Sequence, residues 1–200
     1  MPIYRDAGFE LYNAKNTSEA FKKEVDHSRE PEFYIYSRYR NPTVVSAEAE
    51  IMKLEGCEWS LLTQSGMSAI DTALSIFQNG KETRPWLFFT EIYGGTISFI
   101  ESVLKSRRGL DIQYFTPENG KYDLVKLEDA ISVLKPELVY IESISNPMLI
   151  VSDVAKITVI AKKYGTKVIV DNTFATPWLF KPGNQTSLTT GIDLRNPASL

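Results

Sequence analysis

From residue 46 onward, short apolar runs alternate with longer segments in which apolar residues recur at helical spacing. The short runs have the length of buried strands and lie at 59–63, 86–90, 111–115, 138–142 and 167–171. The segments between them are long enough for crossover helices, which join parallel strands and cover both faces of a sheet. The pattern therefore predicts a largely parallel α/β fold.

Capping residues set the limits of the expected helices. Gly56 closes a segment rich in helix formers, residues 46–55, and Gly165 closes the most regular helical stripe of the chain. Gly94 opens a helix that we expect to reach about Arg107. Asp123 is placed to cap a helix whose inner face carries Leu127, Ala130, Ile131 and Leu134.

Two regions fall outside this alternation. Residues 1–45 have the character of an extended arm with aromatic anchors, and residues 183–200 show no sustained periodicity. We therefore expect three parts: an N-terminal arm at 1–45 that makes inter-subunit contacts, an α/β domain at 46–182, and a C-terminal tail at 183–200.

Composition excludes several classes of protein. The net charge of -3 and pI near 5.4 leave no basic stripe for nucleic acid. The apolar runs are too short to span a bilayer, and residues 1–30 lack the apolar stretch of a secretory signal. The single cysteine, Cys57, cannot form an internal disulfide, which fits a reducing compartment. We expect a cytoplasmic protein without a metal site.

Candidate chemistry lies where the expected strands end, which is where ligands bind in open α/β sheets. Ser65, Gly66 and Met67 follow one strand and open a helix, so their free amides and the Ser65 hydroxyl form a possible phosphate site. A helix cap with a tight turn explains the same three residues.

Asp171 ends the last expected strand. Its carboxylate could cap the following turn, or it could keep a pyridine nitrogen protonated so that the ring acts as an electron sink. Tyr93, which precedes Gly94, is either a core aromatic residue or a side chain that stacks on a cofactor ring.

Four further residues each have an ordinary and a functional explanation. Glu142 and Asn146 flank a strand end, and Asn-Pro is a common turn dipeptide. Tyr36 and Arg38 lie on the arm, where arginine could be solvated or could bind a phosphate.

Taken together and in order, these sites form a recognisable series. The segments are YSRYRNPT at 36–43, QSGMSAI at 64–70, YGGT at 93–96, ESISNP at 142–147 and VDNTFATP at 170–177. The series resembles the N-terminal half of the cystathionine γ-synthase and methionine γ-lyase family, the Cys/Met metabolism enzymes that use pyridoxal 5′-phosphate. The resemblance implies the large-domain portion of the aspartate aminotransferase fold, fold type I.

The resemblance also implies a role for each residue. Tyr36 and Arg38 would bind the cofactor phosphate of a neighbouring subunit. Ser65, Gly66 and Met67 would bind the phosphate within the chain. Tyr93 would stack on the pyridine ring and help with proton transfer or leaving-group departure, and Asp171 would pair with the pyridine nitrogen, so these two are the expected catalytic residues. Asn146 would lie near the ring hydroxyl, with support from Glu142 and Thr173.

The Schiff-base lysine of the family lies beyond this aspartate, in a segment resembling GAD-hydrophobic-hydrophobic-HSxTK. Residues 191–194 resemble the start of that segment, and no lysine follows them. Lys181, the nearest later lysine, is expected to be badly placed for the cofactor aldehyde.

Two functions of different classes follow. In the first, the chain is one subunit of a split enzyme for β- or γ-elimination or γ-replacement on a sulfur-containing or homoserine-derived amino acid. A second polypeptide brings the lysine and the C-terminal domain, giving a heterotetramer, and the isolated chain is inactive. In the second, the chain is a truncated, non-catalytic paralogue or an interaction subunit.

A dinucleotide-binding fold is disfavoured because no G-x-G-x-x-G motif follows an expected strand.

Overall fold

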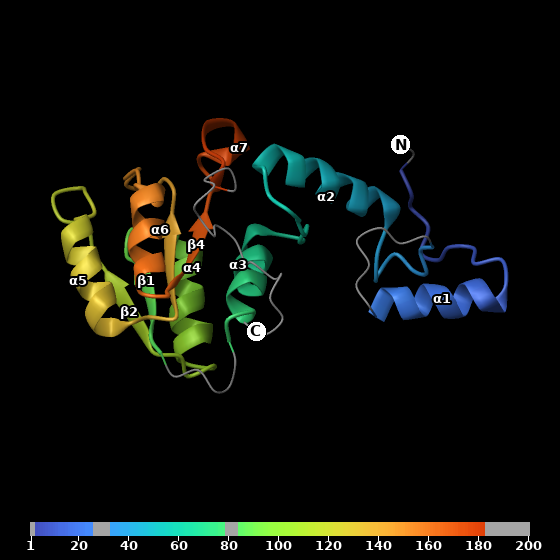
Figure 1. Cartoon of the computed structure of the whole chain (residues 1–200), viewed down its shortest axis with the longest axis horizontal. Coiled ribbons are helices and arrows are strands. Elements are labelled where there is room, and N and C mark those ends of the chain that lie inside the picture. The colour runs from blue at the N-terminus through green and yellow to red at the C-terminus, as the bar shows by residue number, and fades with distance from the viewer. Residues whose placement is uncertain (1–2, 26–32, 79–83, 183–200) are drawn as a thin grey trace. The chain divides into compact units, whose positions relative to one another are not determined.

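The computed structural model describes residues 3–25, 33–78 and 84–182 (Figure 1). The chain divides into two compact units whose boundary falls between Leu62 and Thr63, and each is described by itself. The tail at 183–200, including the segment at 191–194, lies outside the described residues. The expected limits of the arm, domain and tail stay predictions.

The second unit contains a four-stranded sheet. Its strands are β1 (Trp86–Phe89), β2 (Ile112–Phe115), β3 (Leu138–Glu142) and β4 (Lys167–Asp171). Their order is β2-β1-β3-β4, and every neighbouring pair is parallel. The predicted parallel α/β fold is therefore confirmed.

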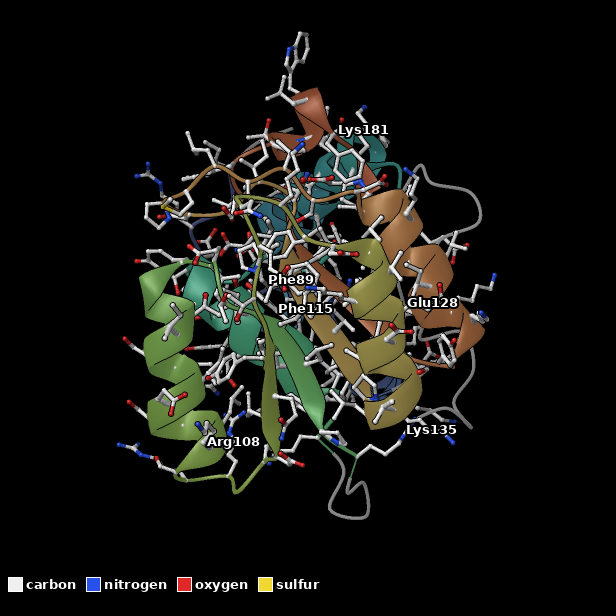
Figure 2. The ribbon with its side chains drawn as sticks, turned by 90° about the vertical axis from the view of Figure 1, so that its left-hand side faces the viewer. Phe89, Arg108, Phe115, Glu128, Lys135 and Lys181 are labelled. Carbon is white, nitrogen blue, oxygen red and sulfur yellow. The ribbon has the colours of Figure 1, made fainter. Side chains whose placement is uncertain are left out.

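Helices connect and cover these strands. They are α3 (Gly66–Ser75), α4 (Gly94–Phe99), α5 (Leu124–Leu134), α6 (Val154–Lys163) and α7 (Thr176–Leu179), with a π-helical segment η1 (Ile100–Lys105) that continues α4. Figure 2 shows α4 on one side of the sheet and α5 and α6 on the other. Both faces are thus covered, as the spacing predicted. The helix expected to reach Arg107 ends at Lys105, with its last turns wound more loosely.

The core forms around the two central strands. Every residue of β1 and β3 is buried, because parallel strands carry helices on both faces. From the helices, Leu104, Leu127 and Ile131 are completely buried against them. The caps behave as the sequence indicated: Asp123 Oδ1 accepts hydrogen bonds from the amides of Val125 and Lys126, at 2.9 and 3.2 Å.

One expected strand, Trp59–Thr63, does not form. Residues 59–63 have no regular structure, and among the described residues no strand pairs with them. A strand is stable only with a hydrogen-bonded neighbour, so a strand-like sequence without a partner stays irregular. The helix that begins at Gly66 consequently follows a coil segment rather than a strand end.

The first unit is more helical than its sequence suggested. It contains α1 (Ala14–Val25) and α2 (Pro42–Glu55). The prediction of an extended arm is wrong for residues 14–25, where Asn13 Oδ1 accepts the Asn16 amide at 2.9 Å and starts a helix. Asn41 caps α2 in the same way, and Gly56 ends it at φ 67°, as expected for a left-handed C-terminal residue.

Membrane insertion finds no support in the described helices. None of them, within residues 3–25, 33–78 and 84–182, is long and apolar enough to cross a bilayer.

Truncating a core residue of α5 should reveal how much the sheet depends on this helix. Leu127→Ala removes a completely buried side chain, and we expect it to lower the free energy of unfolding by about 2–5 kcal/mol. The matched control is Val125→Ala on the exposed face of the same helix, which should change it by less than about 0.5 kcal/mol. Urea unfolding of the full chain measures both; equal effects would contradict the packing described.

Candidate functional site

The connections of the sheet create a crevice at the carboxyl ends of its central strands. From β1 the chain passes to β2 on one side, and from β2 it returns to β3 on the other side of β1. Loops leaving β1 and β3 therefore diverge, and such a switch point is where open α/β sheets bind ligands. Tyr93 follows β1, Glu142 ends β3 and Asp171 ends β4, so all three predicted residues lie at this edge.

The Glu142 side chain joins two of these loops. Its Oε1 accepts a hydrogen bond from the Tyr93 amide at 2.7 Å, and its Oε2 accepts one from the Asn146 amide at 2.9 Å. The residue is only 6% exposed. A single buried carboxylate thus fixes the loop after β1 against the turn after β3.

Burial raises the pKa of the Glu142 carboxyl to about 6, and the negative charge of Asp171 adds to the rise. The two amide donors act in the opposite direction, because they stabilise the ionised form. The group therefore titrates near pH 6.

Asp171 lies beside Glu142 in the register of β3 and β4. Its Oδ1 accepts hydrogen bonds from the Thr173 amide at 3.0 Å and the Thr173 hydroxyl at 2.5 Å, and its Oδ2 accepts the Tyr140 hydroxyl at 3.0 Å. A carboxylate offers about four acceptor positions, so one remains on Oδ2. In the described part of the chain, neither carboxylate has an ion-pair partner.

A small pocket opens beside these carboxylates. Its lining consists of Glu142, Ile144, Asn146, Asp171, Thr173 and Phe174. Its volume of about 20 Å³ is enough for one water molecule. A ring-sized ligand would therefore lie across the mouth of the pocket rather than inside it.

Tyr93 stands at the start of α4 with 48% of its surface exposed, so it is not a core residue. Its ring lies over Gly95, where an added Cβ would overlap the ring atoms. Glycine at position 95 therefore leaves room for an aromatic side chain beside the first turn of the helix. An exposed, supported ring is what stacking on a ligand requires.

Ser65 caps α3, as expected if these residues form a helix cap. Its Oγ accepts the Ser68 amide at 3.1 Å, while the amides of Gly66 and Met67 belong to the first helical turn and have no acceptor within the helix. A Cβ added at Gly66 would meet nothing within 4 Å. The cap therefore leaves two donors and open space for an anion; phosphate binding stays a prediction.

Tyr36 and Arg38 belong to the first unit. The Arg38 guanidinium carbon lies 4.9 Å from the centre of the Tyr36 ring and 5.6 Å from that of Tyr39. The backbone of Tyr36 pairs with Gly8, so the pair is held on an ordered loop. Both side chains are exposed, and their contact with a phosphate stays a prediction.

Aromatic side chains close the other half of the same edge. Phe89 ends β1 and Phe115 ends β2, with ring centres 5.3 Å apart, and Tyr122 packs on Phe89 at 4.3 Å. Figure 2 shows Phe89 and Phe115 at this end of the sheet. The accessible part of the edge therefore lies over β3 and β4.

Lys181 lies at this end too (Figure 2), whereas Arg108 and Lys135 lie at the opposite end. The Asn172 side chain donates to the Phe180 carbonyl at 2.8 Å and closes the loop that carries Lys181 back toward β4. The expectation that this lysine is badly placed for a cofactor aldehyde stays a prediction.

Sequence reasoning missed Tyr140. A fully buried tyrosine needs a partner for its hydroxyl, and this need was a usable indication in the sequence. The partner could be named only once the register of β3 and β4 was known.

The described residues contain no group of three or more His, Cys, Asp or Glu side chains suited to a metal ion.

The fold and this edge define a parallel α/β domain whose candidate site lies at the carboxyl ends of its strands. The family model for Cys/Met metabolism PLP-dependent enzymes matches residues 1–195, and the chain belongs to this family. The resemblance deduced from the motifs is therefore confirmed.

Individual proteins with similar sequences support this family assignment. Over 181 residues the chain is 33% identical to chloroplastic mimosinase of Leucaena leucocephala, covering 90% of this chain and 36% of the relative. It is 37% identical over 158 residues to cystathionine beta-lyase of Lactococcus lactis subsp. cremoris, covering 76% and 38%. The chain thus spans well under half the length of these relatives.

Solved structures share the fold. A putative O-acetylhomoserine (thiol)-lyase from Campylobacter jejuni superposes with a TM-score of 0.72 at 28% identity, covering 95% of this chain and 43% of that one. Cystathionine gamma synthase from Xanthomonas oryzae pv. oryzae gives 0.72 at 26% identity, covering 94% and 42%. The parallel sheet is therefore that of the fold-type I large domain.

The burial of Glu142 should make stability depend on pH in a defined window. Between about pH 4.5 and about 6 the folded chain keeps a proton that the unfolded chain has lost. The free energy of unfolding should therefore fall by about 2 kcal/mol as the pH rises through this window. Glu142→Gln should remove that dependence, although it also weakens one amide contact.

The measurement is urea unfolding from pH 4 to 7, with the wild type and each variant compared as differences. Asp129→Asn, which alters an exposed carboxylate on α5, is the control and should leave the pH dependence intact. A Glu142→Gln profile parallel to that of the wild type would contradict the assigned pKa.

Proposed function

We propose that this chain supplies the N-terminal part of the cofactor pocket of a pyridoxal 5′-phosphate enzyme. The reaction proposed is elimination at the β- or γ-carbon, or replacement at the γ-carbon, of a sulfur-containing or homoserine-derived amino acid. The relatives of this chain support this class, since they include a cystathionine beta-lyase, a cystathionine gamma-lyase and an O-succinylhomoserine sulfhydrylase.

The carboxylate of Asp171 carries the proposal. Two neighbouring carboxylates without an ion-pair partner in the described residues make this edge electronegative, and one acceptor position on Asp171 Oδ2 remains open. A protonated pyridine nitrogen suits both features, because it offers one N–H and a positive charge. When bound, the cofactor supplies an electron sink for a carbanion at the substrate α-carbon.

Other residues would orient the same group. Tyr93 is exposed and its ring lies against Gly95, so it can stack on the ring, and the open amides of Gly66 and Met67 can bind the phosphate. Asn146 lines the pocket and could reach the ring hydroxyl. In this proposal Tyr36 and Arg38 bind the phosphate of a neighbouring subunit.

The lysine and the substrate-binding domain come, in this proposal, from a second polypeptide. Among the described strands β4 pairs only with β3, so its outer edge is open to a further strand. On α7, Trp178 is 90% exposed and Leu179 is 71% exposed. Both features suit coverage by additional chain. Arms that reach between subunits would make the assembly a dimer of heterodimers.

Native mass spectrometry of the chain, alone and co-expressed with the product of the adjacent reading frame, tests this proposal. We expect the isolated chain to be inactive and to form no covalent bond with pyridoxal 5′-phosphate. The co-expressed sample should be a yellow hetero-complex in which borohydride fixes the cofactor on a lysine of the second polypeptide.

Other outcomes are equally clear. Label on Lys181 of the isolated chain would make this residue the cofactor lysine and remove the need for a partner. A colourless chain in both samples would contradict the enzyme proposal and favour a non-catalytic or interaction subunit. Asp171→Asn is the matched variant, because it keeps the side-chain volume and removes the charge that would pair with the ring.

A further inference from the structure

Tyr140 reaches the candidate site from inside the sheet. It lies on β3 two residues before Glu142, so both side chains point to the same face of the sheet. In the register of β3 and β4 Tyr140 stands opposite Ile169, which makes Asp171 its diagonal neighbour. Long side chains can bridge such a diagonal, and the Tyr140 hydroxyl donates to Asp171 Oδ2 at 3.0 Å.

The Tyr140 ring is held firmly. It is completely buried and stacks on Phe88 of the neighbouring strand, with ring centres 5.3 Å apart and planes 29° apart. Burial, and then the negative charge of Asp171, raise the pKa of the Tyr140 hydroxyl well above its ordinary value. The group therefore stays protonated and acts as a donor.

Asp171 needs this second anchor. Both of its contacts with Thr173 go to Oδ1 and come from the adjacent turn. The torsion that turns a carboxylate about its own axis is soft, so contacts to one oxygen leave the direction of the other poorly defined. A donor from a different strand fixes Oδ2 and therefore the direction of its remaining acceptor position.

We propose that Tyr140 is a positioning residue, whose hydroxyl orients the Asp171 carboxylate so that Oδ2 presents its free acceptor position to the ring nitrogen of the cofactor. The inference rests on the proposed function of Asp171. It predicts an effect that depends on the ring nitrogen and on no other part of the ligand.

Binding of two ligands that differ only at this nitrogen tests the inference. The probes are pyridoxamine 5′-phosphate, which needs no lysine, and its 1-deaza analogue, in which carbon replaces the ring nitrogen. Affinities are measured by calorimetry on the full chain. The wild type should prefer the pyridine ring, and Tyr140→Phe should reduce that preference about tenfold, since a hydrogen bond to a charged group is lost.

Two comparisons separate positioning from general damage. Tyr114→Phe removes another tyrosine–carboxylate hydrogen bond of the same sheet, from Tyr114 to Glu101, and should leave the ratio of the two affinities unchanged. Loss of stability alone weakens both ligands equally and does not alter the ratio. Circular dichroism verifies that each variant is folded.

The outcomes distinguish the two proposals. An unchanged ratio in Tyr140→Phe, with wild-type preference for the pyridine ring, would overturn the positioning role and leave the proposed function standing. A wild-type chain that binds neither ring would overturn the inference, and the proposed function would then be decided by labelling of the co-expressed sample alone. A reduced ratio in Tyr140→Phe alone supports the inference.

Discussion

The buried carboxylate of Glu142 is the contact on which the arrangement of the site depends. It accepts hydrogen bonds from the loop that follows β1 and from the turn that follows β3, at the point where the sheet connections reverse direction. Without a common acceptor, these two loops would diverge with their amides unsatisfied in a poorly hydrated place. The cost of burying the charge appears as the raised pKa of Glu142.

A second carboxylate beside the first makes the edge of the sheet electrostatically unfavourable by itself. Glu142 and Asp171 are adjacent in the register, and the donors that surround them in the described structure are neutral amides and hydroxyls. Such donors stabilise each charge but do not cancel it. An edge of this kind gains most from a ligand that brings a positive N–H, which links the stability of the domain to its proposed cofactor.

The aromatic residues at this edge fall into two groups, one packed together and one exposed. Phe89, Phe115 and Tyr122 fill the end over β1 and β2, whereas Tyr93 is exposed and its ring lies against Gly95. One aromatic group therefore excludes water from the core, and the other is available for stacking.

The sequence by itself determined five of the helices, α2 to α6, four of the strands and the family. Apolar spacing and capping residues such as Asp123 and Gly56 act locally, so their effect can be read without knowing the fold. It failed at residues 59–63, because a strand needs a neighbouring strand and only the fold shows that none lies there in the described structure. It also failed at residues 14–25, where the local cap by Asn13 starts a helix within an apparently extended arm. Only the tertiary structure decided that Tyr140 meets Asp171 and that Glu142 joins two loops, because those contacts arise from strand register and from the order of strands in the sheet.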